Sequence, residues 1–566
     1  MKNKSIIWII TIMAFVGQSC EKFLEEDLVS DVSAASYYTT PAGFEDAVDA
    51  TYAWLKYSYG PPERGFTSTV FGTDIFTNGA DGSHKVWNWY DNNFNSGQDL
   101  LRELWRDWYK GINQANAVIN RSTQIEGLDP ALIEQRLAEV RFLRAFFYFN
   151  LVQHWGDVHL TLEETEGIEI EANRTPAAEI YSTAIIPDLE NAISLLPAEQ
   201  NDYGRVTKPA AEFMLAKVLL TRSYKPYADS NDAARAEALM TSVIDNYGFE
   251  LLETYGDLWD QDNQLNTEVI WSVQNTQDLI LNGGEGNRGH LYFLFEYDIR
   301  PGMQRDTENG RPWKRFRPTP FLLSLWNRDI DSRYDQSFKH VWYSNNATSI
   351  PIWTQEDVNN GYTTAANLGQ PKFEVGDTAL FIPGPGRDAL WTAEREGRAG
   401  YNVYTVNEYD ERVFPSLSKF IDPLRPDRQW EPGSRDFVVA RLADAYLIRA
   451  EARLMQNNTT DAAEDINVVR RRAAWPGEED AMEISAADVD IDFILDERAR
   501  ELAGEMQRWF DLVRTGKLVE RVRLYNAEAR DNIQDYHVLR PIPLDQIDRT
   551  QGGYEQNPGY PVAGDD

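Results

Sequence analysis

The chain has 566 residues, of which 42% are hydrophobic and 26% are charged. This is an ordinary globular composition, long enough for several hydrophobic cores, so a disordered chain and a single small domain are both excluded. The formal net charge of −35 argues against nucleic acid or an anionic membrane surface as a partner, because both require clustered lysine and arginine. A neutral ligand, such as a sugar, suits an acidic surface better than a phosphate does.

Residues 1–19 are predicted to be an export signal. Lys2 and Lys4 precede an apolar run that is too short to span a bilayer comfortably. Cys20 follows small residues and is the only cysteine, so no internal disulfide can form. Its position predicts lipid attachment, with a plain secretory signal and a passive cysteine as the alternative. The mature protein, residues 20–566, would then hold a membrane only through that lipid.

The segment KVWNWYDNNFNS (residues 85–96) places aromatic rings among amides. Its alternation favours a short half-buried strand, in which Trp87 and Trp89 share one face while Asn88 and Tyr90 share the other. The asparagine-rich end predicts a loop or a broken edge. These rings either fill a core or form a surface on which a flat, partly apolar ligand stacks.

A helical pattern dominates the N-terminal half of the chain. The apolar residues of 100–119 recur at helical spacing, and Pro130 opens a second helix that ends near Gly156. Further helices are expected over 177–196, 208–222 and 231–247. Pairs of amphipathic helices with short turns predict a tetratricopeptide-like helical-repeat scaffold that leaves a broad surface for a protein partner.

The character of the sequence changes between about residues 248 and 435. Glycine, proline, asparagine and aromatic residues dominate there, and long loops are uncommon in compact domains unless they are functional. Helical patterns then return over 436–455, 460–474 and 492–518, before an extended tail. The expected fold is mostly α. Its helical part is mainly 98–247 and 436–518, and its loop-rich part is mainly 60–97 and 248–435.

No group of residues in the sequence is typical of an enzyme, so no catalytic residue, metal ligand or cofactor is predicted. The six histidines are scattered and form no HExxH motif. DVDIDF (488–493) begins like a calcium loop, but Phe493 replaces the turn glycine and Ala499 stands where a bidentate glutamate is needed. Glycoside hydrolysis requires only two carboxylates. Asp74 and Asp81, close to the aromatic segment, are the pair that this alternative would use.

Seven stretches, taken in order, resemble the SusD/RagB family of lipoproteins from Bacteroidetes-type bacteria. They are AEVRFLRAFFYFNLVQHWGDVHL (138–160), RVTKPAAEFMLAKVLLTRSY (205–224), PTPFLLSLWNRDIDSRYDQSF (318–338), FPSLSKFIDP (414–423), RDFVVARLADAYLIRAEARL (435–454), DERARELAGEMQRWFDLVRTGKL (496–518), and LRPIPLDQI with QNPGY (539–547, 556–560). The charged residues of these motifs are expected to pair and cap helices. They are Arg141, Arg144, Glu451, Arg498, Glu501, Arg508 and Asp511.

The resemblance implies a SusD-like fold and a place on the cell surface, anchored in the outer membrane through Cys20. It also implies a partner, a SusC-like TonB-dependent transporter. In that arrangement the lipoprotein sits as a lid over the barrel, captures oligosaccharides and passes them inward. Peptide or glycopeptide cargo, a surface glycoside hydrolase and a purely structural transporter cap remain alternatives.

Aromatic and polar side chains in the loops are the candidate ligand contacts. Sugar rings stack their apolar C–H faces on tryptophan and tyrosine, while amides, carboxylates and guanidinium groups match the hydroxyls. The candidates are Trp87, Asn88, Trp89 and Tyr90 in the first segment, Tyr292, Arg305 and Trp313 in the segment 290–316, and Trp391 in the segment 384–401.

Overall fold

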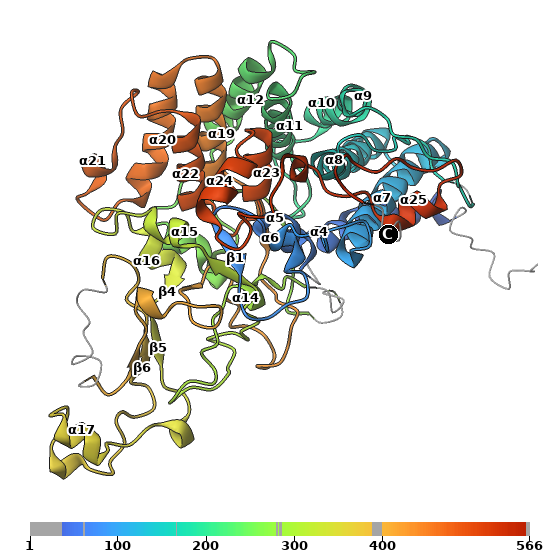
Figure 1. Cartoon of the computed structure of the whole chain (residues 1–566). Helices are drawn as coiled ribbons and strands as arrows, with labels where there is room; N and C mark the ends of the chain where they lie inside the picture. Colours follow the sequence, from blue (N-terminus) through green and yellow to red (C-terminus); the bar gives the residue numbers. More distant parts are fainter. Residues whose placement is uncertain are drawn as a thin grey trace, which may run out of the picture.

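The computed structural model describes residues 37–59, 63–165, 167–278, 281, 286–387 and 399–561 (Figure 1). The export signal, the lipid-attachment residue Cys20 and the candidate Trp391 lie outside these ranges. The fold is mostly helical, as predicted.

Long helices form a layer in which each helix packs on the next (Figure 1). They are α7 (Asp99–Arg121), α8 (Pro130–Trp155), α10 (Ile186–Leu195), α11 (Lys208–Ser223), α12 (Asp232–Asn246), α19 (Leu442–Met455) and α20 (Thr459–Ala473). Helix α12 packs directly on α19, although the whole loop-rich segment lies between them in the chain. The loop-rich segment is therefore an insertion between two consecutive members of one helical layer.

Local signals set the ends of these helices. The Asp129 side chain accepts a hydrogen bond from Ala131 N at 3.0 Å, and Pro130 occupies the first turn of α8. At the other end Gly156 has φ of 72°, a conformation that glycine adopts without a steric cost. Both ends of this helix were predicted from the sequence, and both are confirmed.

Of the three helices predicted in the C-terminal part, the first and the third need correction, whereas 460–474 is helix α20 as predicted. Residues 437–441 form a strand, β9 (Phe437–Arg441), before α19 begins. Its two adjacent valines favour extended backbone, and β2 (Val269–Val273) pairs with it antiparallel. The segment 492–518 is split into α22 (Ile491–Glu501), α23 (Arg508–Arg514) and the start of α24 (Leu518–Tyr525). Gly504 and Met506 both take positive φ between α22 and α23, which ends the first helix.

Short elements fill the loop-rich part. The described residues form three further small sheets: β1 (Phe76–Asn78) with β3 (Phe316–Pro318), β4 (Phe338–Lys339) with β8 (Ser416–Leu417), and β5 (Val341–Tyr343) with β6 (Thr378–Phe381) and β7 (Asn402–Val403). The loop-rich part also contains the short helices α5 (Arg64–Val70), α6 (Val86–Trp89), α14 (Gly289–Tyr292) and α17 (Gln355–Asn359), while α3 (Pro41–Ala53), α4 (Leu55–Tyr59) and α25 (Leu544–Arg549) lie outside it. Phe295, Tyr297, Trp342 and Leu380 share a separate small core around β5 and β6. The region around β5 and β6 projects away from the helical layer and carries α17 at its tip (Figure 1).

Buried carboxylates of α22 join the two parts. The Arg333 guanidinium is fully buried and lies 2.7 Å from Glu497 and 3.0 Å from Glu501. The other Glu501 oxygen is 2.7 Å from Arg441, at the end of β9. Burial alone would raise the pKa of Glu501, but the guanidinium groups of Arg472, Arg441 and Arg333 hold it at about 2.

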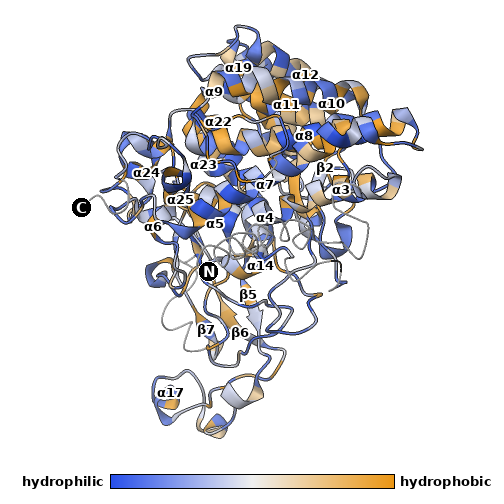
Figure 2. Ribbon diagram, turned by 90° about the vertical axis from the view of Figure 1, so that its right-hand side faces the viewer, coloured by the Kyte–Doolittle hydropathy of each residue, from blue (hydrophilic) through white to orange (hydrophobic). Residues whose placement is uncertain are grey.

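The charged residues of the family motifs are mostly structural, as expected. Arg144 contacts Asp188 at 2.8 Å, and Arg498 bridges Asp444 and Asp511. Figure 2 shows hydrophilic and hydrophobic residues mixed along the helices, as expected of surface helices with one buried face. Within the described ranges, every helix falls short of the length or the apolarity that crossing a bilayer requires.

Candidate functional site

The segment 85–96 is folded differently from the prediction. Residues 86–89 form the helix α6 and not a strand, so the expected sharing of faces is wrong. Trp87 and Asn88 are fully buried and Tyr90 is 2% exposed, whereas Trp89 is half-buried. Three of the four candidates here therefore present no surface on which a ligand could stack.

The buried members of this segment have partners inside the protein. Asn88 Nδ2 donates to Thr77 Oγ1 and Asn78 Oδ1, both at 3.0 Å, and its Oδ1 accepts from Asn526 Nδ2 at 2.9 Å. The Tyr90 hydroxyl donates to the Gly72 carbonyl at 2.8 Å. The amide that was expected to match a sugar hydroxyl instead ties α6 to β1.

Tyr292 is also part of the core. Its side chain is fully buried, and its hydroxyl accepts a hydrogen bond from Glu63 N at 3.1 Å. It lies beneath Trp313, with ring centroids 5.9 Å apart. Tyr292 therefore supports a candidate ligand contact without reaching the surface itself.

Trp89 and Trp313 are half-buried, and one antiparallel ladder connects them. Trp89 Nε1 donates to Asn78 Oδ1 at 3.0 Å, and Asn78 lies opposite Phe316 in the β1–β3 pair. The ladder continues past the strands, because Gly79 N donates to the Arg315 carbonyl at 2.8 Å. The two tryptophans are thus attached to the two strands of one ladder, Trp89 of α6 through its bond to β1 and Trp313 through the chain that leads into β3.

Two arginines flank the Trp313 ring. The guanidinium carbons of Arg311 and Arg315 lie 5.6 and 5.0 Å from its centroid. Trp313 N donates to the Leu291 carbonyl at 2.8 Å, which fixes the backbone below the ring. Lys314 has φ of 43°, a left-handed conformation that is uncommon for a residue with a side chain. Such local strain is often found at functional sites, where the surrounding structure maintains it.

Both Arg305 and Arg311 reach across to one distant loop. Arg305 Nη1 donates to Gln429 Oε1 at 3.1 Å, and Arg311 Nη1 donates to the Gln429 carbonyl at 2.7 Å and to Glu431 Oε1 at 2.8 Å. We call this assembly the Trp313 face. It consists of Arg305, Arg311, Trp313, Arg315, Gln429 and Glu431.

The sequence interpretation named two members of this face and missed the other four. RPWKRF (311–316) offered a signal for Arg311 and Arg315, since basic residues bracket the tryptophan. Nothing local indicates Gln429 and Glu431, which come from a loop more than a hundred residues away in the chain.

Each cation of the Trp313 face has a carboxylate partner. Arg305 contacts Asp298 at 2.8 Å, Arg311 contacts Glu431 at 2.8 Å, and Arg315 contacts Glu63 at 2.5 Å. The guanidinium groups are therefore oriented and their charge is balanced, while the face still offers many hydrogen-bonding groups. This arrangement suits a neutral ligand that has one apolar face and several hydroxyls.

The carboxylate pair considered for hydrolysis is engaged in the structure. Asp74 is fully buried and contacts Arg508 at 2.5 Å and Arg521 at 2.8 Å. Burial alone would raise the pKa of Asp74, but these two guanidinium groups lower it below its usual value. Asp81 contacts Lys314 at 3.0 Å. A buried carboxylate held ionised by two arginines is a structural anchor and a poor general acid. Across the ranges described, no cluster of three or more histidine, aspartate or glutamate side chains could hold a metal ion.

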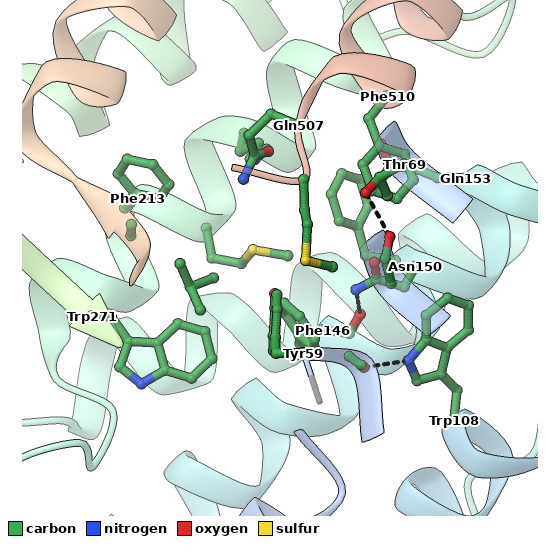
Figure 3. A pocket seen from close by; sticks show the side chains of 18 of the residues that line it. Tyr59, Thr69, Trp108, Phe146, Asn150, Gln153, Phe213, Trp271, Gln507 and Phe510 are labelled. Atoms are coloured by element: carbon green, nitrogen blue, oxygen red, sulfur yellow. Dashed lines mark hydrogen bonds between the residues drawn. The ribbon is translucent and has the colours of Figure 1, made fainter. Parts of the chain in front are cut away.

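A cavity in the helical layer is too small for a sugar. It has a volume of about 50 Å³ and is lined by rings that include Phe146, Phe213 and Trp271 (Figure 3). One water molecule takes up roughly 30 Å³ of liquid, so this space holds little more than water. Trp108 Nε1 donates to Ser58 Oγ at 2.8 Å on its wall.

Known proteins are similar to this protein along nearly the whole length of its chain. A family model described as the SusD family matches residues 267–560, and a second, described as starch-binding associating with outer membrane, matches residues 22–220. SusD-like protein P25 of Formosa agariphila is 28% identical over 98% of this chain and 100% of its own. Starch-binding protein SusD of Bacteroides thetaiotaomicron is 24% identical over 88% of this chain and 86% of its own. The solved structure of a laminarin binding SusD-like protein superposes with a TM-score of 0.66 at 23% identity, covering 92% of this chain and 100% of that chain.

Proposed function

The chain belongs to the SusD family, a family of binding proteins and not of enzymes, and on this basis we propose that it captures oligosaccharides at the cell surface. The proposal includes lipid anchoring through Cys20 in the outer membrane and delivery of the ligand to a SusC-like TonB-dependent transporter. Relatives whose names state a ligand, starch in one case and laminarin in another, support a glycan as the ligand class.

The Trp313 face is the observation that carries the proposal. Trp313 is half-buried, and its ring is held from below by Tyr292 and flanked by Arg311 and Arg315. A sugar ring stacked on the indole would bring its hydroxyls within reach of guanidinium, amide and carboxylate groups that are already oriented. Such preorganisation lowers the entropy cost of binding.

The expected affinity is moderate. Covering roughly 60 Å² of apolar ring surface contributes about 1.5 kcal/mol, which is roughly ten-fold in affinity. A few such contacts, less the cost of association, give binding in the micromolar to millimolar range. This range suits transfer to a transporter, because picomolar capture would impede release.

A binding titration with product detection tests the proposal. Residues 21–566 are titrated with a panel of neutral polysaccharides and oligosaccharides while tryptophan fluorescence and released sugars are followed. Saturable binding without products is the expected result. Product release would instead identify a glycoside hydrolase, and binding of peptides in place of glycans would identify a peptide or glycopeptide carrier. Absence of any ligand would leave a structural cap of the transporter.

A further inference from the structure

An open groove on the helical layer lies between α7 and α25. Its volume is about 920 Å³, within the range of roughly 300–1,000 Å³ that is usual for small-ligand sites. We call it the α7–α25 groove. Its lining includes Trp54, Trp105, Tyr109, Lys110, Asn113 and Gln114. Helices α7 and α25 lie far from α17, on the other side of the molecule (Figure 1).

The rings of the groove are fixed before any ligand arrives. Trp105 is 5% exposed and donates from Nε1 to Gln546 Oε1 at 3.0 Å, which joins α7 to α25. The Tyr109 hydroxyl donates to the His159 carbonyl at 2.8 Å, and its ring centroid is 5.1 Å from that of Trp105. Trp54, just after α3, is half-buried, with its centroid 5.1 Å from that of Tyr57. Partly exposed aromatic faces are therefore available on a rigid support.

Amide side chains stand beside these rings and are oriented by the protein. Asn113 Oδ1 accepts from Thr165 N at 2.8 Å, and Gln114 Nε2 donates to the Ala47 carbonyl at 3.1 Å. Each of these bonds holds one end of an amide in place, and this fixes the direction in which the other end of that amide points. Aromatic faces next to oriented amides suit a saccharide, whose rings have apolar C–H faces and hydroxyl edges.

The charge of the lining is opposite to that of the chain. It contains four cations, Arg102, Arg106, Lys110 and Arg549, and one carboxylate, Asp545, in a protein whose formal net charge is −35. The Arg549–Asp545 pair is solvent-exposed, and such pairs contribute little energy. The Lys110 ammonium group lies 5.7 Å from the centroid of the Trp54 ring. Arg102 and Arg106 also have carboxylate neighbours, Asp99 at 2.7 Å and Asp107 at 3.0 Å, although both arginine side chains are exposed. Among the described residues no carboxylate forms an ion pair with Lys110, so Lys110 is the cation most available to an anionic group.

The Trp313 face differs in this respect, because its arginine–carboxylate pairs are partly buried. In the groove the Arg102–Asp99 and Arg549–Asp545 pairs are exposed to solvent and therefore weak. We propose that the α7–α25 groove is a second ligand site, which binds a short oligosaccharide carrying carboxylate or sulfate groups. One sugar ring stacks on Trp54 while the anionic groups contact Lys110 and Arg106. This inference goes beyond the neutral ligand proposed for the Trp313 face and does not depend on it.

Charge-matched ligand pairs test the proposal on residues 21–566. The probes are oligogalacturonate with its methyl ester, and a sulfated galactan oligosaccharide with its desulfated form. We expect at least one anionic member to bind at least ten-fold more tightly than its neutral partner, and binding to weaken when NaCl is raised from about 50 to 500 mM. The carboxylate and sulfate arms identify which anion is preferred.

Substitutions locate the binding. Lys110→Gln and Trp54→Ala are expected to weaken anionic binding at least ten-fold. The matched controls are Lys372→Gln and Trp353→Ala, since Lys372 lies 4.8 Å from the Trp353 ring near α17. These controls, together with Trp313→Ala, should leave anionic binding unchanged. The proposal is overturned by equal affinity for both members of each pair, by no binding of either anion, by binding of acidic peptides only, or by indifference to Lys110→Gln and Trp54→Ala.

Discussion

The guanidinium carbon of Arg540 lies 4.9 Å from the ring centroid of Trp87, in the interior of the protein. Trp509 stands 4.1 Å from the same guanidinium carbon, and Phe94 stands at 5.4 Å. Arg540 is fully buried and donates from Nη2 to the Ser68 carbonyl at 2.9 Å. Trp87, Tyr90 and Phe94 of the segment 85–96 therefore surround an internal cation of the C-terminal tail, and they connect two distant parts of the chain.

Replacement of Trp87 should act on stability and leave binding intact. We expect Trp87→Ala to lower the free energy of unfolding by about 3–5 kcal/mol, because it leaves a cavity and removes one aromatic contact of Arg540. Urea unfolding measures this loss, and Trp87→Phe, which keeps a ring, should lose less. If Trp87→Ala kept full stability but lost glycan binding, the buried position described here would be wrong.

The histidines near Arg540 should make the protein acid-sensitive below pH 6.5. Burial and then the charge of Arg540 lower the pKa of His154 and of His537 to about 3. Between pH 6.5 and 3 these two histidines are protonated in the unfolded chain but remain neutral in the folded protein. The free energy of unfolding therefore falls as pH falls. Burial raises the pKa of Asp436 to about 6, so this carboxyl group binds a proton more readily in the folded protein and stabilises it as pH falls. It is one group opposing two histidines.

His537→Gln should therefore flatten the pH dependence. Each such histidine contributes up to about 1.4 kcal/mol per pH unit in this window. Unfolding free energies measured from pH 7 to pH 5 should change less steeply in the variant than in the parent chain. Identical slopes would show that His537 also titrates normally in the fold.

The buried Arg333 should be essential for holding the loop-rich part on the helical layer. Arg333→Met leaves Glu497 and Glu501 without one of their cations, and breaking a buried pair in this way costs about 3–5 kcal/mol. Arg387→Met is the matched control, because its pair with Asp329 is exposed, and it should cost less than about 1 kcal/mol. Urea unfolding compares the two variants. Equal effects would contradict the structural role of the α22 carboxylates.

The helical scaffold could be predicted from the sequence because the signals for a helix, its apolar spacing and its end residues, lie within or next to the helix itself. Pro130 and Gly156 mark the ends of α8, and the apolar spacing of α7 is regular. Over 86–90 the same reasoning failed, since aromatic alternation fits a strand while tertiary packing selected a short helix. Trp87 and Trp313 look alike in the sequence. Their different exposure depends on Arg540 in one case and on the loop with Gln429 and Glu431 in the other, and both partners lie far along the chain.

The most direct test of the account is the affinity of the Trp313→Ala variant for the first neutral glycan that binds the parent chain. Isothermal titration should show at least a ten-fold loss of affinity, with the unfolding free energy unchanged within about 1 kcal/mol. Trp353→Ala is the matched control, since Trp353 is also half-buried with a cation over its ring, and it should bind as the parent does. Unchanged affinity in Trp313→Ala would contradict the assignment of the Trp313 face as the glycan-binding site.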